Sequence, residues 1–219
     1  MNENTEIKNV IAPAALEIGP NHLKLGGKYA KTLFILTYPR YLSTGWFSPI
    51  VNLPNLFDIS IFMNPMDTAI ALRNLRKKAG QVQAEVQEAE EKGMVRNPML
   101  ETAFQDIENL RDTLQQGQEN LFSVSAYITF YADDVKTLNE LEGRIMNILE
   151  SRLVYAKPAI FQQLDGFNST LPLLTDRLGI TTPLNSGPAS SFFPFVSINL
   201  TSDSGILYGV NRHNNTLVI

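Results

Sequence analysis

The stretch from Phe57 to Leu153 constrains the fold most, because strand-like and helix-like patterns alternate along it with clear ends. Apolar residues occupy every second position of Phe57–Met63 and again of Leu121–Ala132, with mostly polar residues between them. Strict alternation of this kind is typical of a half-buried β-strand. The stretch therefore predicts two strands separated by about 57 residues of helical pattern.

Two helices are predicted between these strands. Asn64-Pro65 and Asn97-Pro98 each supply a preferred N-cap residue followed by proline at the first helical position. Gly93 follows Lys92 and is predicted to cap the C-terminus of the first helix.

Each predicted helix carries apolar residues that alternate three and four positions apart, which indicates a narrow seam for one partner helix. The residues are Leu72, Leu75, Ala79, Val82, Val86 and Ala89 in the first helix, and Leu100, Ala103, Ile107, Leu110 and Leu114 in the second. The short connection predicts an antiparallel hairpin at about residues 65–118. With a rise of ~1.5 Å per residue it would reach ~38 Å, and we expect it to project from a small sheet.

Before this stretch, Ile18–Leu25 and the turn Gly26-Gly27 predict a short strand pair. Lys31–Tyr38 is apolar on both faces, which is typical of a central strand. The aromatic segment Tyr41–Pro54 predicts one short helical turn, with Trp46 as an anchor for the connection rather than a stacking surface for a ligand.

After the second strand, Asp133-Asp134 stands where carboxylates favour a helix start, and the pattern continues to about Leu153. A strand near Val154–Phe161 and a short helix at Leu171–Leu178 are predicted next. Further strands are expected at 192–200, 206–211 and from Thr216 onward.

The expected fold class is α+β: a small mixed or antiparallel sheet with ferredoxin-like, split βαβ character, whose first crossover is enlarged into the helical hairpin. The predicted organisation is a flexible leader at 1–15, an α+β domain at 16–161, and a connector at 162–219 that starts the β-structure of a following domain. The sequence stops within an apolar strand, so we expect it to be the front portion of a longer protein.

Composition excludes several classes of function. The chain has 219 residues and no cysteine, which removes disulfides and thiolate metal sites. Its net charge of −4 argues against a dedicated duplex-binding surface, which is normally basic. No apolar run reaches the ~18 residues of a membrane span, and the polar start lacks the order of a signal peptide.

No residue is predicted to be catalytic, cofactor-binding or metal-ligating. Gly26-Gly27-Lys28 fails as a phosphate loop, because His22 stands where that loop needs glycine and Tyr29 where it needs Ser or Thr. A hairpin turn accounts for it. His22 and His213 both lie in predicted turns with no neighbour that would complete a ligand pair. Asp133-Asp134 could form an acidic metal pair, but helix capping explains them more simply.

Charges divide the first predicted helix into two halves. Arg73, Arg76 and Lys77 share a face, with Lys78 beside them, and such a face could contact nucleic acid or an anionic membrane. Four glutamates follow and offset them: Glu85, Glu88, Glu90 and Glu91. A solvated helix with opposite-sign halves is one interpretation, and contact with a partner protein is the other.

Several segments resemble a known family. Residues 205–219, preceded by Phe192-Phe-Pro-Phe, are similar to the stretch just upstream of the nucleotide-binding domain in TraC-like conjugation ATPases of type IV secretion systems. Residues 28–39, Gly45-Trp-Phe, residues 58–65 and the charged hairpin also resemble the N-terminal region of that family. The resemblance covers roughly residues 20 to 219 and rests on structural segments rather than catalytic motifs.

The resemblance implies a role by position. It implies a cytoplasmic N-terminal domain, peripheral at the inner face of the cell membrane, that docks a conjugative ATPase onto the inner-membrane proteins of the secretion channel and contributes to assembly of a hexamer. No direct nucleic-acid site is expected. ATP and Mg²⁺ are expected only in a C-terminal ATPase domain that this sequence does not contain, so the chain is not expected to be an enzyme.

Two other functions remain open. The chain could be a stand-alone scaffold that uses the hairpin to bind a partner, which unsatisfied apolar residues on the hairpin seam would support and a closed two-helix seam would weaken. It could also be an enzyme with a scattered site, which would require a deep pocket that gathers Asp, Glu or His.

Overall fold

The computed structural model describes residues 15–93, 95, 97–194, 201–202, 204–211 and 216–219. The fold is α+β with a mostly antiparallel sheet, as the sequence predicts. The chain forms two compact units, the first from residues up to Ser60, Ala126–Ile180 and Ser190 onward, and the second from Ile61–Ser125 and Thr181–Ala189. The predicted leader falls almost wholly outside the described residues, as do most of the strand expected at 192–200 and the turn that contains His213.

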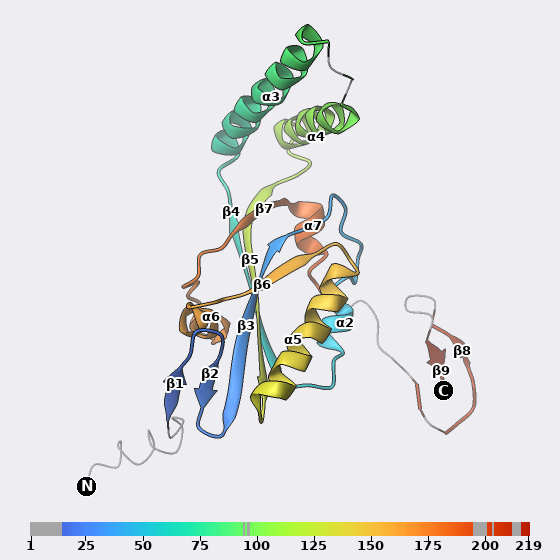
Figure 1. Ribbon diagram of the computed structural model, residues 1–219. Coiled ribbons are helices and arrows are strands. Elements are labelled where there is room, and N and C mark those ends of the chain that lie inside the picture. Colours follow the sequence, from blue (N-terminus) through green and yellow to red (C-terminus); the bar gives the residue numbers. More distant parts are fainter. Residues whose placement is uncertain (1–14, 94, 96, 195–200, 203, 212–215) are drawn as a thin grey trace. The chain divides into compact units, whose positions relative to one another are not determined.

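The first unit contains most of the sheet and the helices on it (Figure 1). Its elements are β1 (Leu16–Ile18), β2 (Leu23–Leu25), β3 (Lys28–Thr37), α2 (Ser48–Val51), α5 (Val135–Glu150), β6 (Tyr155–Pro158), α6 (Gln163–Thr170), β8 (Gly209–Val210) and β9 (Leu217–Val218). Strands β4 (Phe57–Pro65) and β5 (Leu121–Ala132) contribute residues to both units. The bounds of β5 are those predicted from its alternation.

Strand β3 is central, as its apolar sequence predicts. On one edge it pairs antiparallel with β5, from Tyr29 opposite Ala132 to Phe34 opposite Tyr127. On its other edge it pairs with β2 near its start and with β6 from Leu33 onward. The turn between β2 and β3 contains Gly26 at φ +60°, the left-handed region that glycine adopts without strain.

Strand β4 is the neighbour of β5, and this corrects one prediction. The Tyr131 amide donates to the Leu56 carbonyl, and the Met66 amide donates to the Leu121 carbonyl, so the two strands run antiparallel. The two long helices therefore lie in the connection between adjacent strands, not in a crossover as expected. The segment that leads from β3 to β4 contains only α2.

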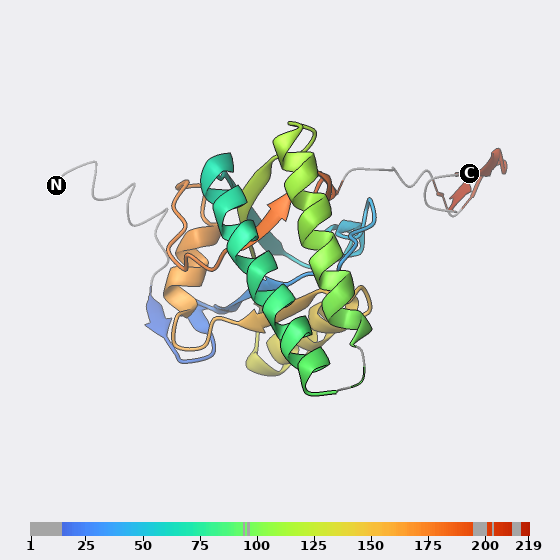
Figure 2. The same ribbon diagram turned by 90° about the horizontal axis from the view of Figure 1, so that it is seen from above.

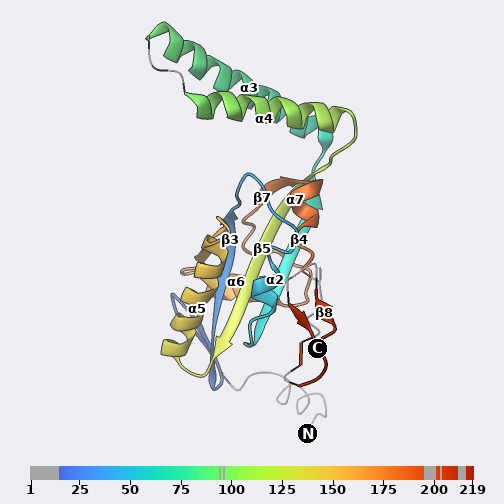
Figure 3. The ribbon, with the colours of Figure 1, turned by 90° about the vertical axis from the view of Figure 1, so that its right-hand side faces the viewer.

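Helices lie on both faces of β3 in the first unit (Figure 3). Helix α5 contacts β3 and β6 and buries one apolar stripe, while α6 contacts β3. The buried stripe consists of Leu138, Leu141, Ile145 and Leu149.

Strand β5 is buried on both faces, so the prediction of a half-buried strand was wrong. Ser125, Tyr127 and Thr129 belong to the face expected to meet solvent, and all three are buried. Their polarity is satisfied inside the protein. The Thr129 hydroxyl lies 2.7 Å from that of Thr32 and 2.8 Å from that of Thr170, and Tyr127 donates to Asp176.

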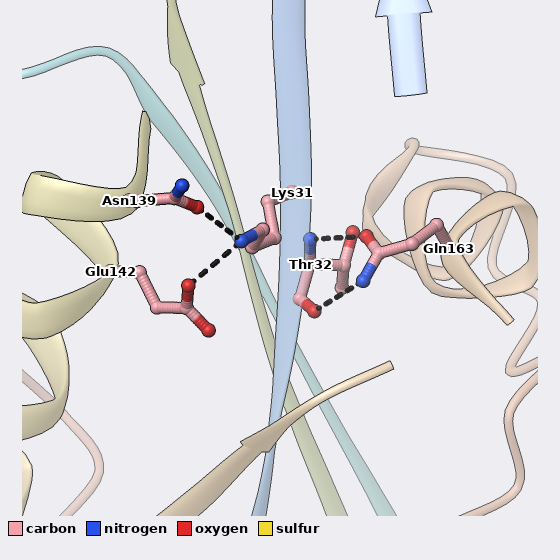
Figure 4. A network of polar contacts seen from close by, with 5 residues as sticks. All are labelled: Lys31, Thr32, Asn139, Glu142 and Gln163. Atoms are coloured by element: carbon pink, nitrogen blue, oxygen red, sulfur yellow. Dashed lines mark hydrogen bonds and ion pairs between the residues drawn. The ribbon is translucent and has the colours of Figure 1, made fainter. Parts of the chain in front are cut away.

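A side chain completes the backbone hydrogen bonding of β3 where β2 has ended and β6 has not begun (Figure 4). The Thr32 amide donates to Oε1 of Gln163 at 2.8 Å, and Nε2 of Gln163 donates to the Thr32 carbonyl at 3.4 Å. Gln163 is 1% exposed. An amide side chain thus takes the place of a strand neighbour, because buried backbone groups require partners.

The segment after β6 differs from the prediction. The helix there is α6, and Leu171–Leu178 is not helical. Leu171 is followed by Pro172, and the residue before a proline is disfavoured in the helical region. Because α6 contacts β3, this part of the predicted connector packs within the first unit.

The second unit contains two long helices, α3 (Thr68–Glu91) and α4 (Pro98–Gln115), together with β7 (Thr182–Asn185) and α7 (Ser186–Ser190, of which all but the last residue belong to it). Strand β7 pairs antiparallel with Leu121–Val124 of β5. None of the described helices has the length and apolar character needed to cross a membrane.

Candidate functional site

The helix pair of the second unit is the candidate interaction surface. Helices α3 and α4 pack against one another and lie side by side in Figure 2. At their strand end, Ala71, Leu114 and Leu121 form a buried cluster against which Met66 and Leu110 pack. Apolar contact therefore holds the two helices together close to the strands from which they arise.

Most predicted seam positions of the pair are protected from solvent. All six seam positions of α3 are buried or half-buried, whereas its charged positions are exposed. In α4, Ile107 and Leu114 are buried. Ala103 is exposed, so its predicted place on the seam was wrong. Phe104, the next residue, is half-buried. The apolar stripes thus face each other.

The helix ends are only partly those predicted. Asn97 caps α4, accepting from the Met99 amide at 3.1 Å. Gly93 directly follows Lys92, the C-cap residue of α3, and has a φ of +63°. The N-cap of α3 is Asp67, whose carboxylate accepts from the Ile70 amide at 3.0 Å, and not Asn64. Asn64 and Pro65 belong to β4, whose pairing with β5 continues through the Met66 amide.

The outward face of α3 carries the charges that the sequence singled out. Arg73, Arg76, Lys77 and Lys78 are all exposed, and none forms an ion pair with a described residue. Of the four glutamates, Glu88 pairs with Lys92 at 2.5 Å, one turn away. The basic half of α3 is therefore not neutralised from within the described part of the chain.

His22 belongs to no reactive group within the described residues, and His213 lies outside them. His22 lies edge-on to Tyr29, with ring centroids 5.4 Å apart. Both line a small hollow of about 270 Å³, whose remaining lining includes Glu17 and Lys24. These two charges pair with each other at 3.0 Å, and the hydrogen bond to Glu17 raises the pKa of Lys24. No group of three or more His, Cys, Asp or Glu side chains among the described residues could hold a metal ion.

The remaining sequence candidates have structural roles. Lys28 follows the β2–β3 turn and pairs with Asp133 at 2.8 Å. Asp134 caps α5, accepting from the backbone amide of Thr137 at 2.8 Å and from its hydroxyl at 2.7 Å. The pKa of Asp134 is lowered, mainly because the Thr137 amide donates a hydrogen bond to its carboxylate.

Trp46 is an anchor, as predicted. It is 1% exposed, packs against Phe47 and Phe192, and donates from its indole nitrogen to the Ser191 hydroxyl at 3.1 Å. Tyr38 packs edge-on to the same ring. Burial raises the pKa of Tyr38, so its hydroxyl is neutral at physiological pH.

Two buried polar groups, Gln163 and Lys31, were not predicted from the sequence. The Lys31 ammonium lies 2.8 Å from Glu142 and 2.8 Å from Asn139, both on α5 (Figure 4). The position of Lys31 within an apolar run was a signal that its side chain is buried. Gln163 lies in a Pro- and Ser-rich segment, which gives no such signal.

No protein-family model matches the chain, and no curated protein matches it in a sequence comparison. The resemblance to TraC-like conjugation ATPases therefore remains an expectation from the sequence.

Proposed function

We propose that this chain is an N-terminal docking and assembly domain of a TraC-like conjugative ATPase, and that it contacts inner-membrane proteins of a type IV secretion channel. The observation that carries the proposal is the exposed basic half of α3, which has no ion-pair partner among the described residues. Unpaired like charges on one helix face attract an oppositely charged partner and accelerate its association.

The scaffold alternative requires an apolar strip left open on the hairpin. The seam residues of α3 and α4 instead cover one another, with Ala79 and Ile107 at 5% and 9% exposure. This favours a charged docking surface over an apolar groove, because a helix-in-groove partner requires exposed apolar anchors. In the proposed role the chain acts through binding, and nucleotide hydrolysis belongs to a C-terminal ATPase domain.

Membrane vesicles test the docking role. The purified chain is sedimented with inverted inner-membrane vesicles from cells that carry a type IV secretion channel, and with vesicles from cells that lack it. We expect co-sedimentation only with channel-bearing vesicles. The variant K77E/K78E should weaken it about tenfold or more, and raising the salt concentration should weaken it as well, because screening acts on exposed charges.

The matched control is R144E/R152E, which reverses two exposed arginines outside α3 and changes the net charge by the same amount. Equal co-sedimentation with both vesicle types would indicate binding to lipid. Absence of binding to channel-bearing vesicles would overturn the docking role.

A further inference from the structure

Helix α3 presents a second stripe, on the side away from its seam. This outer stripe consists of Arg73, Lys77, Gly80, Ala84, Gln87 and Glu91, all of which are exposed. Its members alternate four and three residues apart, the spacing that keeps one face of a helix toward a partner helix. We propose that two copies of this chain pair antiparallel along the outer stripe of α3.

The register follows from the order of the charges. When two α3 helices run antiparallel with Gly80 of each opposite Ala84 of the other, Arg73 of each lies opposite Glu91 of the other. Arg73 and Glu91 are 18 positions apart, which is ~27 Å along the helix at 1.5 Å per residue. The midpoint between Arg73 and Glu91 is also the midpoint between Gly80 and Ala84. The stripe is therefore complementary to itself when reversed. Parallel pairing in register would oppose like charges.

The residues at the centre permit close approach. A Cβ added to Gly80 would meet nothing within 4 Å, and Ala84, one turn later, has only a methyl group. Helices packed through small residues reach the short end of the usual 8–10 Å interaxial range. At that separation the long side chains at both ends of the stripe can reach across.

The charges needed for the pairing are free within the described residues. Arg73, Arg76, Glu90 and Glu91 form no ion pair there, whereas Glu88 is already paired with Lys92. Arg76 flanks the outer stripe on the same side as Glu90, so the proposed register brings these two within a turn of each other. A two-fold axis repeats every contact, because both copies use the same patch.

Exposed ion pairs each contribute little and are screened by salt. We therefore expect a weak dimer that forms at high protein concentration and low salt. This inference goes beyond the proposed docking role, because it concerns two copies of the chain and is measured without membranes. The vesicle variant alters Lys77 and Lys78. Lys77 belongs to the outer stripe but to neither of the proposed ion pairs. Because the dimer is measured without membranes and through other charges, either proposal can fail without the other.

Sedimentation equilibrium of the purified chain at up to millimolar concentration provides the first test. We expect a monomer–dimer equilibrium whose dissociation constant rises about tenfold between 50 and 500 mM NaCl. R73E/R76E and E90R/E91R should each abolish dimer formation. An equimolar mixture of the two variants should dimerise again, and so should the chain that carries all four reversals.

Two controls keep the test decisive. R144E/R152E should dimerise like the parent chain, and the far-ultraviolet circular dichroism of every variant should match that of the parent. A monomer under all conditions would overturn the proposal. So would a dimer that both R73E/R76E and E90R/E91R leave intact, or one that mixing these variants fails to restore.

Cross-linking tests the register separately, because the chain has no cysteine of its own. Under oxidising conditions Q83C should give a disulfide-linked dimer, since residue 83 lies beside the proposed two-fold axis. N74C lies on the same helix and is equally exposed, but its two copies would be ~24 Å apart at 1.5 Å per residue. Equal cross-linking of N74C and Q83C would contradict the antiparallel register.

Discussion

The side chain of Gln163 acts as a strand neighbour for Thr32: its amide accepts from the Thr32 nitrogen at 2.8 Å and donates to the Thr32 carbonyl at 3.4 Å. The carbonyl also accepts from the Ala159 amide at 3.0 Å, whereas the single N–H of the Thr32 backbone is directed at Gln163. The helix that carries Gln163 is therefore tied to the central strand through one buried side chain.

Gln163→Ala should lower the free energy of unfolding by ~1–3 kcal/mol, because it leaves the buried Thr32 amide without an acceptor. Urea unfolding followed by circular dichroism measures the loss. The control is Gln162→Ala at the exposed neighbouring position, which should change stability by less than ~0.5 kcal/mol. Equal effects at the two positions would contradict the role assigned to Gln163.

Two glycine substitutions should have opposite signs. A Cβ on Gly166 would lie 2.8 Å from Cγ2 and 2.9 Å from Cβ of Thr32, so Gly166→Ala should destabilise the chain by ~1–3 kcal/mol through overpacking. A Cβ on Gly143, on the exposed side of α5, meets nothing within 4 Å. Gly143→Ala should therefore stabilise by up to ~1 kcal/mol through helix propensity. Thermal unfolding of both variants checks the pair.

The N-cap of α3 can be located by mutation. Asp67→Ala should cost ~0.5–2 kcal/mol, because it removes the acceptor for the Ile70 amide. Asn64→Ala should have little effect, since Asn64 lies exposed in β4. A larger loss of helical circular dichroism from Asn64→Ala than from Asp67→Ala would restore the cap predicted from the sequence.

The Lys31–Glu142 pair should respond unequally to loss of its two members. The Lys31 side chain is 6% exposed and that of Glu142 is 19% exposed. Glu142→Ala should cost roughly 3 kcal/mol, because it leaves a buried ammonium without its counter-ion. Lys31→Met should cost less, since it removes the more deeply buried charge and keeps an apolar chain. A double-mutant cycle in urea measures the coupling between them.

Acid should remove the contribution of Asp134. Its pKa is lowered below the ordinary value of 3.8 because it accepts from the Thr137 amide in the folded state. A carboxylate with a depressed pKa stabilises the fold above its unfolded pKa, and this contribution is lost as the pH falls through the folded value. Asp134→Ala should lower the melting temperature by a few degrees at pH 7 and by less near pH 3. An unchanged difference at pH 3 would contradict this account.

Sequence periodicity located strand β5 and helix α5, which appear where alternation and 3.6-residue spacing predict them. In α5 the side-chain pattern also determines which face is buried. The capping residue of α4 was also predicted correctly, since Asn97 precedes a proline at the first helical position.

The predictions were wrong where contacts with residues distant in the chain determine the structure. The polar face of β5 is buried because hydroxyls from β3 and α6 bond to it, and those partners lie 97 and 41 positions away in the chain. Asn64-Pro65 stays in a strand because Leu121 supplies a hydrogen-bond acceptor for the next residue. The helix and strand propensities of neighbouring residues contain no information about such contacts. The same limit applies to the surface of α3: the sequence shows which charges this helix carries, but not which partner binds to them.

The adjacency of β4 and β5 also bears on how this protein can change in evolution. Because the helix pair joins two neighbouring antiparallel strands, its length does not affect the register of the sheet. The entropic cost of a longer connection grows by only ~0.6 kcal/mol for each doubling of its length. Both helices can therefore gain or lose whole heptads together, which would shift or resize the charged face while the hydrogen bonds from Met66 to Leu121 and from Tyr131 to Leu56 stay in place.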